Sequence, residues 1–362
     1  MKHPIIFTAE LECTLSQFID ECKPDKVFIL TDDVTIEACY PIVQHFYCLK
    51  NSVCITIPSS DNNKTLGSLT QVWNYLQKEK ATRHSLLINL GGGMITDLGG
   101  FAAATFKRGM RFINLPTTVL AMVDASVGGK TGINFGGLKN EIGAFCDAEA
   151  VLIDTKWLKT LDKENILSGY AEMLKHGLLS ERSHLTELLT FDIDDIDLKK
   201  LFTLLEKSVE VKKKIVEKDP HEQNIRKALN YGHTFGHAFE SWAMHRNQIL
   251  HGYAVAYGIV CELYLSVVLQ GFPTEVMRHV VNFIKAHYGV LPISCDDYLE
   301  LISLMQHDKK NHGGTINFTL LQDVGKIAIN QTASEEMIRE ALDFLREALI
   351  PQHYYNLNFL ST

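Results

Sequence analysis

Short hydrophobic runs alternate with helical patterns over roughly the first 150 residues of the chain. Residues 64–80 carry apolar side chains at helical spacing. Five other segments are short apolar runs bounded by turn residues, which is typical of buried strands. These segments are residues 26–33, 52–58, 85–93, 111–118 and 150–155. Because strands and helices alternate, the pattern predicts an α/β fold with a mainly parallel sheet.

After about residue 160 the pattern changes to long amphipathic segments, which predict a mainly helical region. The predicted helices are residues 164–179, 197–219, 225–242, 251–270 and 274–288. Residues 315–330 contain two strand-like runs around Asp323 and Gly325 and predict a hairpin. Ser334 is the expected cap of a last helix over residues 334–349.

We therefore predict two domains: a Rossmann-like α/β domain over residues 1–158 and a mainly helical domain over residues 159–362. A chain of 362 residues is long enough for two cores. No flexible linker separates the two segments, so we expect tight packing around a cleft, which is a common place for a ligand.

The net charge, the cysteine content and the distribution of apolar residues limit the classes of protein to which the chain could belong. The net charge of −8 argues against a general nucleic-acid-binding role, so an anionic substrate would need a local cluster of cations. Eight scattered cysteines without a CxxC pair are typical of a reducing cytoplasm. We find neither a signal peptide in the first residues nor a run of about twenty apolar residues, and we predict no membrane span.

Two glycine-rich stretches are candidates for binding phosphate groups. Residues 91–93 are three glycines between a predicted strand and a predicted helix, where backbone can approach a diphosphate closely. The same glycines also suit an ordinary tight turn, and they do not match GxGxxG. Residues 123–145 combine glycines with Lys130, Lys139 and Asn140, although a P-loop is excluded because Asp124 stands where its first glycine would be.

The stretch NYGHTFGH, residues 230–237, contains two histidines four positions apart. On one continuous helix, Arg226, Asn230, His233 and His237 would share a single face. Such a face could bind an anion or a metal, or simply be solvated. His251 opens the next predicted helix and could face His233 across an antiparallel helix pair.

A carboxylate would complete a zinc site that keeps one open position. Glu172 is the best candidate, with Lys175 on the same helical face. A Glu–Lys pair at this spacing is also common as a plain surface ion pair.

Seven motifs in this order closely resemble the 3-dehydroquinate synthases, which belong to the sugar phosphate cyclase family. The similarity extends from about residue 26 to residue 350, and the set is far more specific than any one of its members. The motifs are GGGMITDLGGFAAATFKRG, LPTTVLAMVDASVGGKTGIN, GLKNEIGAF, SGYAEMLKHG, NYGHTFGHAFE, LHGYAVAYG and HDKKNHGGTINFTLL.

The resemblance implies an N-terminal NAD-binding α/β domain and a helical C-terminal domain. It implies Zn²⁺, with Co²⁺ as a possible substitute, held by Glu172, His233 and His251, so that His237 would face the substrate phosphate instead. The residues that resemble the family's NAD⁺ contacts are Asp32, Asp61, Lys64, Gly92, Gly93, Asp97, Thr117, Thr118, Asp124, Lys139, Thr160 and Leu161.

The implied reaction converts 3-deoxy-D-arabino-heptulosonate 7-phosphate into 3-dehydroquinate and phosphate, a step of the shikimate pathway. The implied phosphate contacts are Lys130, Asn140, Asn230 and His237, with Arg108 supplied by the partner subunit of a homodimer. The implied carboxylate contacts are Lys212 and Arg226, and Lys175 is a further substrate contact. Lys130, Lys175, Arg226, Asn230 and His237 are the expected catalytic residues, and Lys309 or Lys310 is expected near the site.

Two positions depart from the family pattern. Asp61 stands where the family has glutamate, which shortens the reach of the carboxylate toward a ribose. Tyr253 stands where LHGE has its acid, which removes one carboxylate near His251 and leaves open what supports this histidine.

Three other functions remain open on the residues alone. A different sugar phosphate cyclase would share the fold, although Lys212 and Arg226 favour a substrate with a carboxylate. Lys212, however, begins a KKK run, and such runs are usually solvated. A zinc polyol dehydrogenase of the glycerol dehydrogenase type would need fewer cations, and a non-enzymatic NAD- or metal-binding regulator would leave the residues from Arg226 to His237 unexplained.

Overall fold

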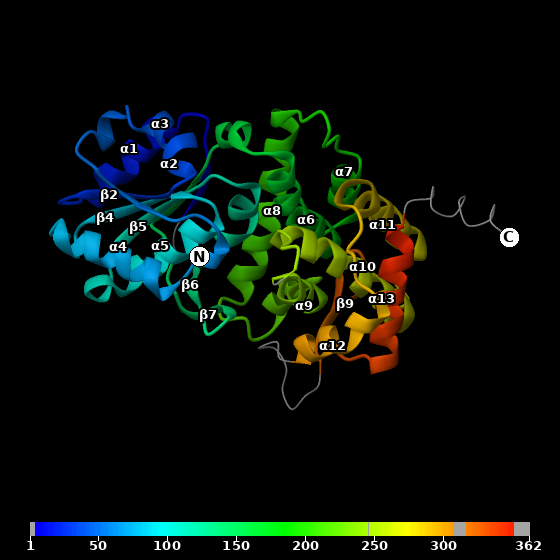
Figure 1. The fold of residues 1–362 in the computed structure, drawn as a ribbon. Helices are drawn as coiled ribbons and strands as arrows, with labels where there is room; N and C mark the ends of the chain where they lie inside the picture. The colour runs from blue at the N-terminus through cyan, green and yellow to red at the C-terminus, as the bar shows by residue number, and fades with distance from the viewer. Residues whose placement is uncertain (1–3, 245, 307–315, 351–362) are drawn as a thin grey trace. The chain divides into compact units, whose positions relative to one another are not determined.

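The computed structural model describes residues 4–244, 246–306 and 316–350 (Figure 1). Two compact units are distinguished: residues 1–169 with 198–217, and residues 170–197 with 218–362. The sequence pattern suggested one change of domain, between residues 158 and 159. It did not indicate that residues 198–217 return to the first unit.

Six strands form a parallel sheet in the first unit. They are β1 (Ile5–Phe7), β2 (Val27–Asp32), β3 (Val53–Ile57), β4 (Leu86–Gly91), β5 (Arg111–Pro116) and β8 (Ala150–Ile153). Their order in the sheet is β1-β8-β5-β4-β2-β3, and every pair is parallel. The five predicted strands and the parallel sheet are confirmed. The three-residue strand β1 is too short to show a pattern of its own.

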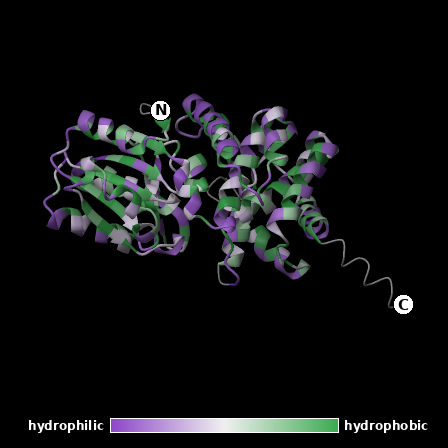
Figure 2. Ribbon diagram, turned by 90° about the horizontal axis from the view of Figure 1, so that it is seen from above, coloured by the Kyte–Doolittle hydropathy of each residue, from purple (hydrophilic) through white to green (hydrophobic). Residues whose placement is uncertain are grey.

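The first unit also contains helices. They are α1 (Leu11–Cys22), α2 (Thr35–Ala38), α3 (Tyr40–Val43), α4 (Leu66–Lys78), α5 (Gly93–Thr105), the start of α6 (Lys163–Leu179) and α8 (Leu198–Lys218), with short helical turns at residues 47–49, 61–63, 106–108, 121–125 and 155–160. A side chain at Gly99 of α5 would overlap Asn89 of β4, so glycine allows this helix to lie close to the sheet. Figure 2 shows the resulting hydrophobic interior of this unit.

The second glycine-rich stretch forms a hairpin instead of an open loop. Strand β6 (Lys130–Phe135) pairs in antiparallel fashion with β7 (Leu138–Phe145). Gly136 and Gly137 make the two-residue turn with φ of 60° and 81°, values that favour glycine at both positions. The sequence analysis did not predict this hairpin, and the phosphate contacts expected in the stretch stay a prediction.

The second unit is mainly helical. Its elements are the rest of α6, α7 (Arg182–Leu189), the short helix η6 (Ile225–Asn230), α9 (His233–Ala243), α10 (His251–Gln270), α11 (Thr274–Tyr288), η7 (Cys295–Asp297), α12 (Tyr298–Gln306), β9 (Phe318–Asp323), β10 (Lys326–Gln331) and α13 (Glu335–Leu349). The predicted hairpin is confirmed as β9 and β10. Ser334 caps α13 by accepting a hydrogen bond from the Met337 N–H at 3.3 Å.

Helix α10 is the core of this unit. Within the described ranges, it is the one helix long and apolar enough to cross a membrane, and most of it is buried inside the protein. It packs against α9, α11, α13 and β9. Burial on all sides is typical of the central helix of a globular protein.

The predicted helix over residues 225–242 is broken, which corrects the sequence analysis. The 3₁₀ turn η6 ends at Asn230, and α9 begins at His233. Between them Gly232 has φ of 80°, a left-handed conformation that ends a helix. Arg226 and Asn230 therefore do not share one continuous helical face with His233 and His237.

Candidate metal and cofactor sites

Three side chains of the second unit converge as predicted for a metal site. Glu172 comes from the middle of α6, His233 from the first residue of α9 and His251 from the first residue of α10. The Nε2 atoms of both histidines lie 3.4 Å from Glu172 Oε1. One potential ligand atom from each residue lies within 4.8 Å of the other two.

The spacing of these atoms suits zinc. Ligand atoms bound at about 2.0–2.1 Å in a tetrahedron are about 3.3 Å apart. The two distances of 3.4 Å between imidazole and carboxylate match that spacing. Two imidazoles and one carboxylate form a typical catalytic zinc set, which leaves a fourth position for substrate. The same donors accept cobalt.

Each imidazole is oriented through its other ring nitrogen. His233 Nδ1 lies 3.1 Å from the backbone oxygen of Tyr231. His251 Nδ1 lies 3.2 Å from Glu240 Oε2. A hydrogen bond at Nδ1 leaves Nε2 as the metal donor, which is the usual arrangement around protein-bound zinc.

The surroundings of His251 favour positive charge. Burial lowers the pKa of His251, but Glu240 and Glu172 outweigh this effect and raise the pKa to about 10. Two carboxylates that stabilise a proton here would also stabilise a metal ion in its place.

Lys175 forms a buried ion pair with Glu172. Its Nζ contacts Glu172 Oε2, whereas Oε1 of the same carboxylate faces the two histidines. The two side chains are 1% and 0% exposed, which excludes the solvated surface pair considered from the sequence. Glu172 is thus held between a fixed cation and the candidate metal position.

The remaining predicted residues of the second unit lie near α9. The rings of His237 and His233 are 5.2 Å apart, and His237 is outside the group of three candidate ligands. Asn230 Nδ2 donates to Glu222 Oε1 at 2.7 Å. Arg226 is 2% exposed and donates through Nη1 to the backbone oxygen of Pro220 at 2.5 Å. Lys309 and Lys310 lie outside the described residues.

The candidate dinucleotide site of the first unit is the carboxyl edge of its sheet. Neighbouring strands β2, β4 and β5 end there at Asp32, Gly91 and Pro116. Among the described residues, no side chain caps the start of α5, which follows the glycines and offers its N–H groups to an anion. A Cβ at Gly92 would lie 3.2 Å from Thr118 Cγ2, which is a tight contact, so the turn leaves little room for a side chain at this position.

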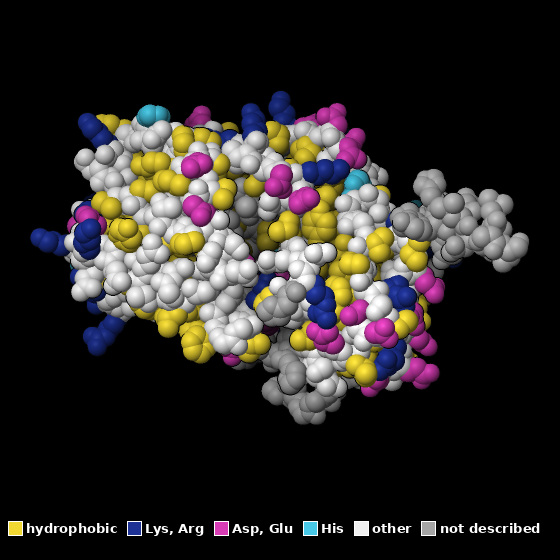
Figure 3. Space-filling view, in the orientation of Figure 1, with side chains coloured by type: hydrophobic (Ala, Val, Ile, Leu, Met, Phe, Trp, Pro, Cys, Tyr) yellow, Lys and Arg dark blue, Asp and Glu magenta, His cyan; other side chains and the backbone are white. Residues whose placement is uncertain are grey.

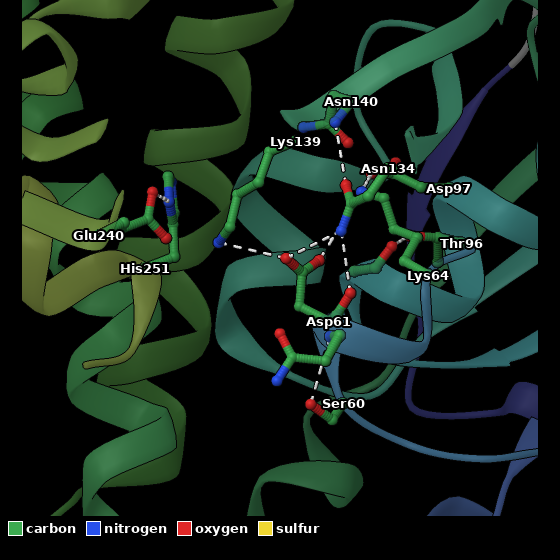
Figure 4. Close-up of polar contacts among 12 residues, drawn as sticks. Ser60, Asp61, Lys64, Thr96, Asp97, Asn134, Lys139, Asn140, Glu240 and His251 are labelled. Carbon is green, nitrogen blue, oxygen red and sulfur yellow. Dashed lines mark hydrogen bonds and ion pairs between the residues drawn. The ribbon is translucent and has the colours of Figure 1, made fainter. Parts of the chain in front are cut away.

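A polar network joins several predicted NAD⁺ contacts (Figure 4). Lys64 Nζ lies 2.7 Å from Asp97 Oδ2, and Lys139 Nζ lies 3.1 Å from Asp61 Oδ2. Burial raises the pKa of Asp97, although Lys64 opposes this effect. Asn134 Nδ2 donates to the Asp61 backbone oxygen at 2.9 Å.

The other predicted cofactor residues have structural partners at the same edge. Asp32 accepts a hydrogen bond from the Thr35 N–H at 2.7 Å and fixes the turn after β2. Thr117 N–H donates to the Gly91 oxygen at 3.0 Å. Thr160 Oγ1 lies 4.0 Å from Cys39 Sγ, which brings the segment before Leu161 next to the helices that follow β2.

Lys212 is buried, unlike the rest of its KKK run. Its Nζ lies 2.6 Å from Asp124 Oδ1 and donates at 2.6 Å to the Asp124 backbone oxygen. Its side chain is 8% exposed, whereas those of Lys213 and Lys214 are 40% and 66% exposed. The solvated-face interpretation therefore fails for Lys212 and holds for its two neighbours.

Three predicted phosphate contacts lie on exposed parts of the first unit. Lys130 begins β6, and Asn140, in β7, has φ of 51° and donates its backbone N–H to Asn134 at 2.9 Å. Arg108 follows α5 with φ of 67°. On the face seen in Figure 3, cationic and anionic side chains are interspersed.

Sequence reasoning missed two buried glutamates near these candidate ligands. Glu240 contacts His251, and Glu262 of α10 accepts hydrogen bonds from the start of α9. Glu240 lies two helical turns after His233, a spacing that could have indicated a shared face. Glu262 lies inside an otherwise apolar helix, which is itself an indication of a specific partner.

Comparisons with known proteins agree with this geometry. Residues 54–168 match the family model described as "3-dehydroquinate synthase N-terminal", and residues 169–311 match "3-dehydroquinate synthase C-terminal". A 3-dehydroquinate synthase of Parabacteroides distasonis is 54% identical over 348 residues, which cover 96% of this chain and 99% of the relative.

Two solved structures share the fold. A 2-epi-5-epi-valiolone synthase from Streptomyces hygroscopicus, with NAD⁺ and Zn²⁺ bound, has a TM-score of 0.85 at 21% identity, covering 96% of this chain and 97% of its own. A 2-deoxy-scyllo-inosose synthase complexed with carbaglucose-6-phosphate, NAD⁺ and Co²⁺ has a TM-score of 0.83 at 22% identity, with 95% and 96% covered.

The parallel sheet with its glycine turn and the helical unit with its Glu/His group give the chain the two-domain fold of these two synthases. Among proteins with this fold, the two family models and the 54% identical relative give the family. The chain belongs to the 3-dehydroquinate synthase family.

Proposed function

We propose that the chain converts 3-deoxy-D-arabino-heptulosonate 7-phosphate into 3-dehydroquinate and phosphate, as a cytoplasmic enzyme of the shikimate pathway. Aromatic amino acid and chorismate biosynthesis depend on this step. The observation that carries the proposal is the convergence of Glu172, His233 and His251 at zinc-like spacing. It occurs in a chain that matches both family models.

Zn²⁺ would be held by Glu172, His233 and His251, and Co²⁺ could replace it. NAD⁺ would lie at the carboxyl edge of the sheet, with its diphosphate at the glycines that open α5. The other proposed contacts are Asp32, Asp61, Lys64, Asp97, Thr117, Thr118, Asp124, Lys139, Thr160 and Leu161. When bound, NAD⁺ would accept and return a hydride, and the metal would polarise the substrate hydroxyl that is oxidised.

The phosphate ligands proposed from the family resemblance are Lys130, Asn140, Asn230 and His237. Cations and amides of this kind suit a leaving phosphate because they stabilise the negative charge that develops on it. We propose that the phosphate itself takes the neighbouring proton. These residues would then fix the base as well as the leaving group.

Lys212 and Arg226 are proposed to bind the substrate carboxylate. Both are buried, at 7% and 2% exposure, and a buried cation pairs more strongly with a carboxylate than an exposed one does. A dianionic substrate would otherwise be repelled by a chain with a net charge of −8. Lys175 would contact substrate while it holds the Glu172 carboxylate in place.

A homodimer is proposed because the family resemblance places Arg108 at the partner's phosphate site. Arg108 is exposed and has left-handed backbone, as does Lys107 before it. Two consecutive non-glycine residues in this conformation are strained, which often marks a functional segment.

A comparison of three substrates, each tested separately, distinguishes this proposal from its alternatives. The purified protein would be given 3-deoxy-D-arabino-heptulosonate 7-phosphate, glucose 6-phosphate, or glycerol, each with NAD⁺. We expect a carbocyclic product from the first alone and no accumulation of NADH. NADH released from glycerol would instead indicate a polyol dehydrogenase, and cyclisation of glucose 6-phosphate would indicate another sugar phosphate cyclase.

A further inference from the structure

Glu240 is a buried carboxylate beside the candidate metal site. It lies on α9, and its side chain is 4% exposed. Its Oε2 lies 3.2 Å from His251 Nδ1, on the side of the ring away from Glu172. Burying a carboxylate is costly unless it is paired, and His251 is a partner of the Glu240 carboxylate.

Position 253, where the family has an acid, cannot serve His251 in this way. Tyr253 lies two residues after His251 on the same helix, and such residues do not share a face. Its ring packs edge-on against Tyr288, with the centroids 5.0 Å apart. The sequence left the carboxylate support of His251 open, and in the structure Glu240 on another helix provides it.

The two candidate histidine ligands differ in what orients them. His233 Nδ1 is bonded to the backbone oxygen of Tyr231, a group that no side-chain substitution removes. His251 Nδ1 depends on the side chain of Glu240. The main chain thus orients His233, whereas a single side-chain substitution at Glu240 can change the orientation of His251.

We propose that Glu240 is a positioning residue of the metal centre. It keeps the His251 proton on Nδ1 and fixes the ring, so that Nε2 points to the metal. This role rests on the proposed metal site. Loss of such a partner typically weakens metal binding by about 10- to 100-fold.

The test is a chelator-competition titration of metal-free protein with Zn²⁺ and with Co²⁺. We expect E240A to bind about 10- to 100-fold more weakly than the wild type. E240Q should lose less affinity, because its amide oxygen still accepts the hydrogen bond. E300Q is the matched control, since Glu300 pairs with Arg246 on the surface of the same unit and does not contact the triad.

A second readout separates positioning from general stability. The visible spectrum of bound Co²⁺ should change in E240Q, and the rise in Tm on metal binding should shrink, whereas the Tm of the metal-free protein should stay close to that of the wild type. If E240A does not fold, E240Q is used alone to test the positioning role, because glutamine has nearly the same shape as glutamate. Affinities and spectra of folded E240 variants that match the wild type would overturn the role of Glu240.

The variant H251A distinguishes a failure of the proposed role of Glu240 from a failure of the proposed metal site. If H251A loses metal affinity and the E240 variants do not, Glu240 has no positioning role and the metal site stands. If H251A binds metal as tightly as the wild type, the proposed triad is wrong, and the role of Glu240 fails with it.

Discussion

Glu262, in the middle of α10, accepts a hydrogen bond at 2.8 Å from the backbone N–H of Gly232, the residue just before α9. Its second oxygen accepts from the Thr234 N–H at 3.2 Å. The carboxylate therefore caps α9 from a different helix and holds the backbone of His233 between the two bonded residues. In the reverse direction, Glu240 of α9 contacts the His251 ring, so each helix supplies a carboxylate to the first turn of the other.

Removing this cap should destabilise the fold. E262A leaves two buried N–H groups without their acceptor, and we expect a loss of about 3 kcal/mol in the free energy of unfolding. E262Q should lose less, because one oxygen remains as an acceptor. Urea denaturation of metal-free protein measures both values. A loss below about 0.5 kcal/mol for E262A would contradict the capping role.

Lys212 and Lys214 provide a matched pair for the proposed carboxylate contact. K212M should raise KM for the substrate by about 10-fold or more, because a buried, charge-assisted contact is lost. K214M changes a side chain that is 66% exposed and should leave the kinetics unchanged. Steady-state kinetics at saturating NAD⁺ measure the difference. Equal KM values for the two variants would contradict the role of Lys212.

Asp219 should make part of the stability depend on pH. Burial raises its pKa, but hydrogen bonds from the N–H groups of Asn224, Gln223 and Arg226 outweigh this and hold the pKa below its ordinary value of 3.8. The ionised form is therefore favoured by folding. Its contribution is complete above pH 3.8 and is lost as the pH falls through the lower, folded-state pKa.

D219N tests this linkage. The variant should be less stable than the wild type at pH 7, and the difference should shrink as the pH falls below 3.8. Unfolding curves across this range measure the difference. A difference that stayed constant with pH would show that Asp219 does not act through its charge.

His237 should be needed for turnover and dispensable for metal binding. Its ring is 5.2 Å from that of His233, but it is outside the candidate ligand triad. H237A should therefore lose about 100-fold or more in kcat while it retains its metal. H233A is the contrasting variant, because it should lose the metal itself. Metal content and steady-state kinetics are measured for both variants. If H237A lost as much metal as H233A, His237 would be needed for metal binding, which would contradict the prediction.

The parts of the fold that follow a single local pattern could be predicted from the sequence. One example is the strand β4 with the glycines and helix α5 that follow it. Another is the hairpin that β9 and β10 form. The break at Gly232 was missed because the residues around it continue the helical spacing, whereas only the packed structure shows its φ of 80°. The return of α8 to the first unit depends on long-range contacts such as that between Phe7 and Phe202.

The grouping of the three candidate metal ligands was predicted from the sequence. The glutamates that contact this group and the start of α9 were not. Glu172, His233 and His251 are residue types that commonly bind metals, but the family resemblance was needed to select these three as a set. Glu240 and Glu262 have meaning only through the partners that the antiparallel packing of α9 and α10 gives them. Similarly, Lys212 cannot be distinguished from Lys213 and Lys214 until the helix is packed and one face is buried.

The most direct test of the account is phosphate release from 3-deoxy-D-arabino-heptulosonate 7-phosphate by the purified protein. It would be measured with and without NAD⁺ and with a metal chelator, and the carbon product would be coupled to dehydroquinase. We predict release that requires NAD⁺, stops with the chelator, returns with Zn²⁺ or Co²⁺, and yields one dehydroquinate for each phosphate. No release from protein that holds both metal and NAD⁺ would contradict the proposed function.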